Sequence, residues 1–221
     1  MQRRVAITGL GIVSTFGNDV GGFWDAVLAG QTGGSEVSLD GLPTLPGVRV
    51  LEFDADGVIG KREARRMDRV GIFAAVAAAQ ALADAGPHGI APERIGTAIG
   101  CAHGGAGTVE ETQRTLLERG LDRVSPFAIP LGLVNSPVAG TARLHNLKGP
   151  SAAPATACAA GSDAIGWAYE RVRDGRADAM VAGGAEAALV PSVLAGYIRL
   201  GAIASLTHGA AAASRPFDTA R

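Results

Sequence analysis

The 221-residue sequence contains only two cysteines, Cys101 and Cys158. They form no CxxC pair, and two thiols are too few for a disulfide framework or a cysteine-rich metal site. The four histidines, at positions 88, 103, 145 and 208, are scattered without the HxxxH spacing of many metal sites. We therefore expect the chain to use neither a metal ion nor an organic cofactor.

Charge and long apolar runs are also scarce. The formal net charge is −1 and charged residues make up 19% of the chain, so no global basic field supports nucleic-acid binding. No window of about 18 apolar residues is free of a charge or a helix breaker, so we expect no transmembrane helix. Residues 1–4 lack the apolar core of a signal peptide. The expected protein is soluble and cytoplasmic, and binds neither nucleic acid nor membranes.

What the sequence does contain favours a close-packed globular protein, with 47% hydrophobic residues and 32 glycines. Short apolar runs alternate with segments of helical periodicity, which indicates βαβ units and a largely parallel sheet covered on both faces, an α/β fold. The predicted strands cover residues 5–8, 48–53, 95–101, 152–157 and 178–182. The predicted helices cover residues 23–29, 62–85, 110–119, 138–145, 161–173 and 191–198, with a loop over 125–130.

The helix predicted over residues 62–85 has the strongest periodicity. Its apolar stripe is mostly alanine, so it should pack very close to its neighbour; the stripe comprises Met67, Val70, Ala74, Ala78, Ala81 and Ala85. A second face carries four arginines: Arg62, Arg65, Arg66 and Arg69. The usual explanation of such a charge run is a solvated helix face, which the residues alone favour. The alternative is a docking surface for an acidic partner or a phosphate.

The pair Gly9 and Gly11 after a predicted strand raises the question of dinucleotide binding. The third glycine of a GxGxxG motif is missing, because Ser14 occupies that position. No clear acidic residue follows about 20 positions later. A tight turn between a strand and a loop is therefore the preferred interpretation.

Cys158 lies where an apolar run is followed by a helix, in the stretch Ala155–Gly161. A thiol at a helix N-terminus faces unpaired backbone N–H groups and the positive end of the helix dipole, which favours the nucleophilic thiolate. The alternative is a small packed residue at a strand–helix junction, and position alone does not decide between them. Cys101, at a strand end with no basic neighbour, is better explained by packing.

The motifs around Cys158 occur in an order that is hard to obtain by chance. Leu147–Ser151 leads into Ala155–Gly161, then Ala164–Gly166, and then Asp178–Glu186. This series resembles the β-ketoacyl–acyl-carrier-protein synthases, the condensing enzymes that elongate fatty acids and type II polyketides. The resemblance extends along the whole chain, through Val5–Gly11, Lys61–Asp68, Ser125–Phe127 and Ser214–Asp218.

The resemblance implies a thiolase-like fold, with two similar α/β halves in α-β-α-β-α layers. It implies that Cys158 accepts an acyl chain from acyl carrier protein and that its backbone N–H is one oxyanion donor. Decarboxylation of malonyl carrier protein then provides the carbanion that attacks this thioester. It also implies a dimer and a role for the basic helix in carrier docking. His103 occupies a position that is usually apolar beside the acyl pocket, and Ala128 follows Phe127 where a second bulky group is common, which predicts an altered pocket.

The sequence departs from the family in length. The family continues into a second half that carries two catalytic histidines, a lysine and the second oxyanion donor. We therefore expect residues 1–221 to be the N-terminal part of a ketosynthase domain, with the C-terminal half supplied elsewhere. The partner would be a second copy or a related ketosynthase subunit. The alternative function is that of a non-catalytic, chain-length-factor-like subunit, which retention of Cys158 argues against. A degradative thiolase fits less well.

Overall fold

The computed structural model describes residues 3–51 and 53–219. The chain divides into two compact units. Among the described residues, the first comprises 3–11 and 54–187, and the second comprises 12–51, 53 and 188–219. The predicted catalytic, pocket and docking residues all belong to the first unit.

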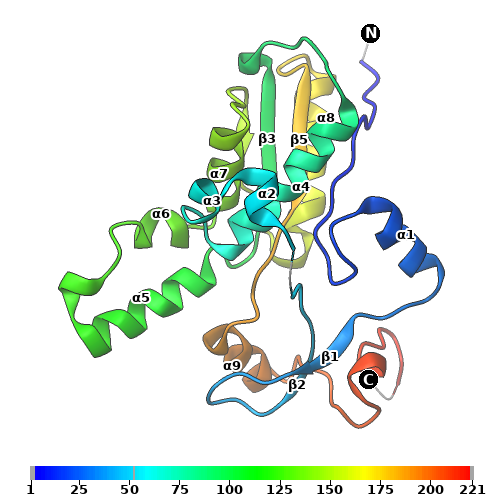
Figure 1. The fold of residues 1–221 in the computed structure, drawn as a ribbon. Coiled ribbons are helices and arrows are strands. Elements are labelled where there is room, and N and C mark those ends of the chain that lie inside the picture. Colours follow the sequence, from blue (N-terminus) through cyan, green and yellow to red (C-terminus); the bar gives the residue numbers. More distant parts are fainter. Residues whose placement is uncertain (1–2, 52, 220–221) are drawn as a thin grey trace. The chain divides into compact units, whose positions relative to one another are not determined.

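The first unit is built on a three-stranded parallel sheet in the order β4-β3-β5, of which β3 and β5 lie side by side in Figure 1. The central strand β3 spans Ile95–Gly100, after a short 3₁₀ helix, η1, at Pro92–Arg94. Its neighbours are β4, Ser151–Ala152, and β5, Ala179–Gly184. The prediction of a parallel sheet is confirmed. All six residues of β3 are buried, as expected for the central strand of a covered parallel sheet.

Helices cover both faces of this sheet. Because side chains of a strand alternate between faces, Ala98 and Ile99 belong to different cores. Ala98 packs against Ala164 and Ala168 of α8, Ala160–Arg173. Ile99 packs with one residue from each of two other helices, α4 (Arg69–Ala85) and α7 (Ser136–Leu144). The small alanines on α8 let its axis approach the sheet closely, and this fixes the position of the helix N-terminus.

The helix predicted over residues 62–85 is divided in two. A short helix α3, Lys61–Ala64, follows α2, Ala55–Ile59, and α4 begins only at Arg69. The cause is Asp68, whose extended backbone and side chain form an N-cap that accepts a hydrogen bond from Val70 N–H at 3.1 Å. The predicted alanine stripe is confirmed in α4, which ends at Gly86 with φ of 69°.

His145, the C-cap of α7, provides a test of stability against pH. Its Nε2 lies 3.2 Å from the carbonyl oxygen of Ala75 on α4. Burial lowers the pKa of this imidazole below its ordinary 6.5. The unfolded chain therefore binds a proton at a higher pH than the folded chain does. Stability from this group is complete above about pH 6.5 and decreases as the pH falls toward the lowered folded value.

Thermal unfolding followed between about pH 7.5 and 5.5 should show this decrease. In His145→Gln, which keeps a side-chain donor, the slope of melting temperature against pH should be shallower. A control variant, His88→Gln, replaces an exposed histidine and should retain the parent slope. Equal slopes for the parent and His145→Gln would contradict the assignment.

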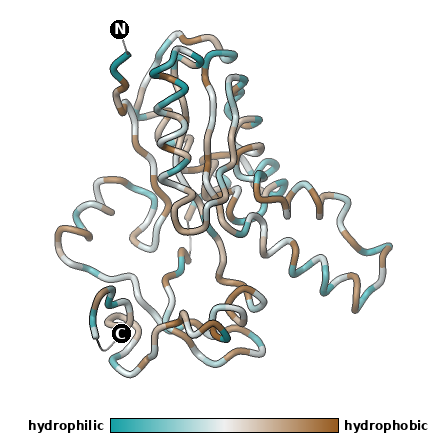
Figure 2. The backbone as a smooth tube through the Cα atoms, turned by 180° about the vertical axis from the view of Figure 1, so that it is seen from behind, coloured by the Kyte–Doolittle hydropathy of each residue, from teal (hydrophilic) through white to brown (hydrophobic). Residues whose placement is uncertain are grey.

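The segment between β3 and α7 forms a helical hairpin. Helix α5 spans Ala106–Arg119, a 3₁₀ turn η2 covers Leu121–Arg123, and α6 spans Ala128–Gly132. The predicted loop therefore ends at Phe127, and its last three positions begin α6. Hydrophobic and hydrophilic residues are mixed along α5 (Figure 2), and Val109, Leu116 and Leu117 are exposed.

The second unit contains a helix, a hairpin and a C-terminal helix. Helix α1, Val20–Leu28, is capped by Asp19, which accepts a hydrogen bond from Gly22 N–H. Strands β1, Gly34–Val37, and β2, Leu45–Val48, pair antiparallel. The strand predicted over 48–53 is wrong at residues 49–51 and 53, and residue 52 lies outside the described residues. Helix α9, Pro191–Leu200, confirms the last predicted helix, and a 3₁₀ turn η4 follows at Ala210–Ala212.

The strand predicted over residues 5–8 is also wrong. Residues 3–13 form no helix or strand, and Ile7 is 83% exposed. The segment is held by α4 instead of a sheet neighbour. The Leu10 N–H donates to the Asp84 carboxylate at 2.9 Å. A Cβ atom on Gly9 would lie 2.1 Å from the carbonyl oxygen of Ala81, so only glycine permits this approach.

Candidate active site

The three parallel strands bring three chemically distinctive residues to one edge of the sheet. Cys158 follows β4, His103 follows β3 and Glu186 follows β5. Because the carboxyl ends of parallel strands meet at the same edge, the loops that carry these residues are neighbours there. This is the edge at which open α/β sheets bind their ligands.

Cys158 lies in a 3₁₀ turn, η3, Ala157–Ala159, which runs directly into α8. The predicted position at a helix N-terminus is confirmed. The residue is exposed, and among the described residues its thiol has no hydrogen-bond or ion-pair partner. An accessible thiol at this end of a helix faces backbone N–H groups and the positive end of the helix dipole.

Glycines fix the start of α8 against the sheet. A Cβ atom on Gly100, the last residue of β3, would lie 2.0 Å from the carbonyl oxygen of Ala160. A Cβ atom on Gly184, at the end of β5, would lie 2.9 Å from the Cα atom of Gly161. Both strand ends therefore contact the first turn of α8 through backbone alone. This contact fixes the position of the turn that carries Cys158.

The residue before the thiol is strained. Ala157 has φ of 52°, a left-handed conformation that costs a non-glycine residue about 1–2 kcal/mol. A hydrogen bond across the turn compensates, because the Thr156 hydroxyl donates to the carboxylate of Asp163 in the first turn of α8. Such strain is concentrated at functional sites.

The strand predicted over residues 152–157 is shorter than expected. Strand β4 ends at Ala152, and Pro154 explains why, since proline has no N–H to donate to a sheet ladder. The loop still contacts β3, because Cys101 N–H donates to the Pro154 carbonyl oxygen at 3.1 Å. This bond joins the Cys158 loop to the loop that carries His103.

Glu186 connects the loops after β3 and β5. Its carboxylate accepts hydrogen bonds from the N–H of Ala102 at 2.9 Å and of Ala187 at 3.3 Å. His103 Nδ1 lies 3.4 Å from Glu186 Oε2. This role of Glu186 was not predicted from the sequence, where the residue only closes a motif. The signal that could have revealed it is an acidic residue two positions after a glycine-rich strand end.

Cys101 is a packing residue, as predicted. It is only 2% exposed, and its Sγ lies 3.7 Å from Glu186 Oε1 and accepts a hydrogen bond from Gly104 N–H at 3.2 Å. Burial, and then the charge of Glu186, raises the pKa of this thiol. Cys101 therefore stays protonated at neutral pH, unlike a nucleophilic thiol.

The other predicted pocket residues lie at the start of α6. Phe127 is the N-cap of this helix and is 54% exposed, whereas Ala128 is buried as its first residue. The structure thus places Phe127 with its ring accessible and Ala128 within the fold. The assignment of His103, Phe127 and Ala128 to one acyl pocket stays a prediction.

The four predicted docking arginines are all exposed, but they do not share one helix. Arg62 belongs to α3, Arg65 is its C-cap, Arg66 lies between the helices, and Arg69 begins α4. The guanidinium of Arg69 lies 5.0 Å from the centre of the Phe73 ring, a cation–π contact. These four residues, which we call the arginine stripe, therefore extend from α3 across the connecting turn to the start of α4.

The described residues contain no helix long and apolar enough to cross a membrane. Within residues 3–51 and 53–219 there is also no group of three or more His, Cys, Asp or Glu residues that could hold a metal ion.

The model of the β-ketoacyl synthase N-terminal domain matches residues 2–220. The 3-oxoacyl-[acyl-carrier-protein] synthases 2 of Synechocystis and Vibrio cholerae are each 38% identical over this whole chain. The chain covers 54% of each of these relatives, so it spans about half their length.

Solved structures agree with the sequence matches. A β-ketoacyl synthase from Burkholderia phymatum matches with a TM-score of 0.87 and 30% identity, over 100% of this chain and 55% of that one. The ishigamide ketosynthase/chain length factor matches with a TM-score of 0.79 and 25% identity, over 91% of this chain and 51% of that one. The fold is thus α/β and thiolase-like, and the chain belongs to the β-ketoacyl synthase family.

Proposed function

We propose that this chain is the N-terminal part of an acyltransferase that extends a fatty-acid or polyketide chain by decarboxylative Claisen condensation. The observation that carries the proposal is the exposed thiol of Cys158 on a strained turn at the N-terminus of α8. The family match supports it, because relatives that are 38% identical are named as 3-oxoacyl-carrier-protein synthases.

The chemistry at Cys158 would proceed in two stages. The thiolate attacks the carbonyl carbon of an acyl carrier thioester. The carrier thiolate leaves and takes up the proton released from Cys158. Malonyl carrier protein then loses carbon dioxide, and its carbanion forms a carbon–carbon bond to the cysteine-bound acyl carbon. The Cys158 thiolate departs, while its backbone N–H stabilises the developing oxyanion.

The second stage needs groups that we assign to the C-terminal half of a complete synthase. The share of the relatives that the chain covers supports this assignment. We propose that a second copy or a related ketosynthase subunit completes a dimer. The predicted cytoplasmic location is part of the same proposal.

The first stage can be tested on the chain itself. Incubation with octanoyl carrier protein should increase its intact mass by one octanoyl group, and peptide mapping should locate this group on Cys158. The absence of any adduct on a folded sample, checked by circular dichroism, would contradict the proposed nucleophile.

The second candidate function is a non-catalytic subunit of the chain-length-factor kind. The observation in its favour is the structural match to a ketosynthase/chain length factor. Such partner subunits lack the cysteine, whereas Cys158 is present and exposed here. Acyl transfer to Cys158 therefore distinguishes the two candidates.

We further propose that the arginine stripe docks the acidic acyl carrier protein. The double variant Arg62→Glu with Arg65→Glu should weaken carrier binding at least about tenfold at low salt, with a smaller loss at high salt. Surface plasmon resonance over a salt series would measure this.

The matched control for this variant reverses two other exposed cations, with Arg4→Glu and Lys148→Glu. Lys148 lies near the amino end of β3, since its N–H donates to the Pro92 carbonyl oxygen. Arg4 follows Arg3, which pairs with Asp178 just before β5. The control makes the same change in net charge, so it should bind the carrier within about threefold of the parent. Equal losses in the two double variants would refute specific docking.

His103 is proposed to set the preferred acyl chain together with Phe127 and Ala128. Nδ1 of this polar ring lies 3.4 Å from Glu186 Oε2, so an alkyl chain beside the ring would contact a polar group. His103→Ile should therefore raise the yield of Cys158 adducts from long alkyl thioesters several-fold relative to short ones. Identical chain-length profiles for parent and variant, measured by intact mass, would contradict this role.

A further inference from the structure

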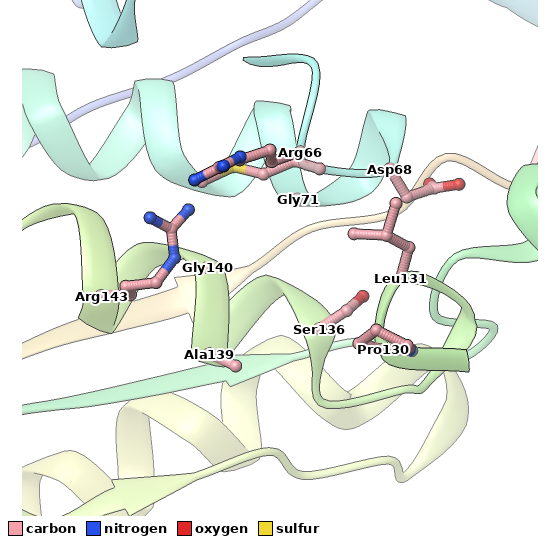
Figure 3. A pocket seen from close by; sticks show the side chains of 10 residues that line it. Arg66, Asp68, Gly71, Pro130, Leu131, Ser136, Ala139, Gly140 and Arg143 are labelled. Atoms are coloured by element: carbon pink, nitrogen blue, oxygen red, sulfur yellow. The ribbon is translucent and has the colours of Figure 1, made fainter. Parts of the chain in front are cut away.

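A small pocket lies in the first unit, between the start of α4 and helices α6 and α7 (Figure 3). Its volume is about 170 Å³. Arg66 and Arg143 line one end, and their guanidinium groups point toward one another (Figure 3). Met67, Leu131 and Ala139 provide apolar walls.

Of the two guanidinium groups, only that of Arg143 has an ion-pair partner among the described residues. Arg143 Nη2 pairs with Glu63 Oε2 at 2.5 Å. The structure gives no side-chain hydrogen bond or ion pair to Arg66 within the described residues. Arg143, and then Arg66, lowers the pKa of Glu63, so this carboxylate stays ionised but is shared between two cations. One positive charge is therefore left over at this end of the pocket.

Two further polar side chains, Asp68 and Ser136, line the pocket. The carboxylate of Asp68 is already engaged, because it accepts hydrogen bonds from the N–H and the hydroxyl of Thr108 at 3.0 and 2.7 Å. Ser136 Oγ is buried and has no hydrogen-bond partner. The pocket thus combines a cationic end, an apolar middle, one unsatisfied hydroxyl and, beside Thr108, the carboxylate of Asp68.

We propose that this pocket binds a short aliphatic carboxylate, with its carboxyl oxygens between Arg66 and Arg143 and its carbon chain against Met67 and Leu131. A guanidinium donates paired hydrogen bonds that match a carboxylate. A water-sized group occupies about 30 Å³, so the pocket holds roughly five or six such groups. Butyrate has this size, as does the end of a glutamate side chain.

Glu63 acts as the resident competitor in this arrangement. It holds Arg143 when the pocket is empty and must give way, in part, when a second carboxylate enters. Removal of its charge should therefore strengthen binding. A purely structural ion pair predicts the reverse, since loss of Glu63 would then only loosen Arg143.

The experiment titrates the 221-residue chain with butyrate and follows the arginine side-chain and backbone NMR signals. Butan-1-ol and butylamine are the probes that lack a carboxylate. Butyrate should shift signals of Arg66, Arg143 and Leu131, and the two controls should not. Arg143→Ala should weaken butyrate binding about tenfold or more, whereas Glu63→Gln should strengthen it about threefold.

Arg114→Ala is the matched control, because its side chain is 52% exposed and ion-paired, against 51% for Arg143. It should leave butyrate affinity within about twofold of the parent. Equal binding by the parent and Arg143→Ala would overturn the proposal, as would no gain in Glu63→Gln. Each variant is compared with the parent by its backbone spectrum, which shows whether the fold is retained.

A second arm distinguishes a free acid from an acidic side chain of a partner. If carrier protein displaces butyrate in parallel with its own binding, the natural carboxylate comes from the carrier. If both bind together, it is a free acid. The pocket shares Arg66 with the arginine stripe but does not rest on the proposed docking, because the butyrate result is independent of whether the carrier binds.

Discussion

Replacing Cys158 by alanine should abolish transfer of the octanoyl group to the chain. The rate should fall by at least about 1,000-fold, since the one remaining thiol, Cys101, is buried and has a raised pKa. Stability should change little, because the side chain is exposed and makes no hydrogen bond or ion pair to a described residue. Intact-mass measurement over a time course would give the rate.

Cys101→Ala is the natural control, since it removes the other thiol. Its thiol is buried and has a raised pKa, so transfer to Cys158 should persist at a rate within about threefold of the parent. Melting temperature should fall, because a small cavity replaces the packed sulfur. Retained acylation in Cys158→Ala that is lost in Cys101→Ala would reverse our assignment of the nucleophile.

The second large effect is expected at Gly100. An alanine Cβ there would lie 2.0 Å from the carbonyl oxygen of Ala160 and 2.7 Å from the nitrogen of Gly161. Neither backbone group can move without displacing the first turn of α8. Gly100→Ala should therefore lower the free energy of unfolding by at least about 3 kcal/mol. Urea denaturation followed by circular dichroism would measure it.

Gly166 is the matched glycine, because it lies in the middle of α8 with open space where a Cβ atom would be added. Gly166→Ala should stabilise the chain by about 0.5–1 kcal/mol, through the higher helix propensity of alanine. Gly100→Ala should also slow acylation in whatever fraction remains folded, since it disturbs the turn that carries Cys158. Equal stability of the two variants would show that the contact is not tight.

Periodicity predicted the helices better than the strands. In α4 and in the helix after Cys158, the apolar spacing is repeated over several turns. One residue that departs from the spacing therefore does not obscure the helix. The break at residues 65–68 depends on a single cap at Asp68, which the stripe hides because Met67 continues it. A cap is a local hydrogen bond, and apolar spacing carries no information about it.

The strand predictions failed where an apolar run lacks a neighbouring strand. Residues 5–8 have strand composition, yet they pair with no strand, and the residues that follow them, 9–11, contact α4. Residues 153–157 stop pairing because of Pro154. For the candidate site, motif order predicted a nucleophile at Cys158 and helical spacing indicated the arginine stripe, and both roles stay predictions. The connection through Glu186 depends on which strand ends are neighbours, and this is a property of the sheet order rather than of any local sequence.

The glycine contacts of the N-terminal segment bear on how the chain folds. Gly11, like Gly9, has no room for a Cβ atom, which would lie 1.9 Å from the carbonyl oxygen of Ala77. These residues leave the ribosome before α4 does, and the helix surface that receives them is complete only after residue 85 has followed. Loop closure over this separation opposes early docking. This segment precedes α4 in synthesis but is therefore among the later parts of the first unit to reach its native position.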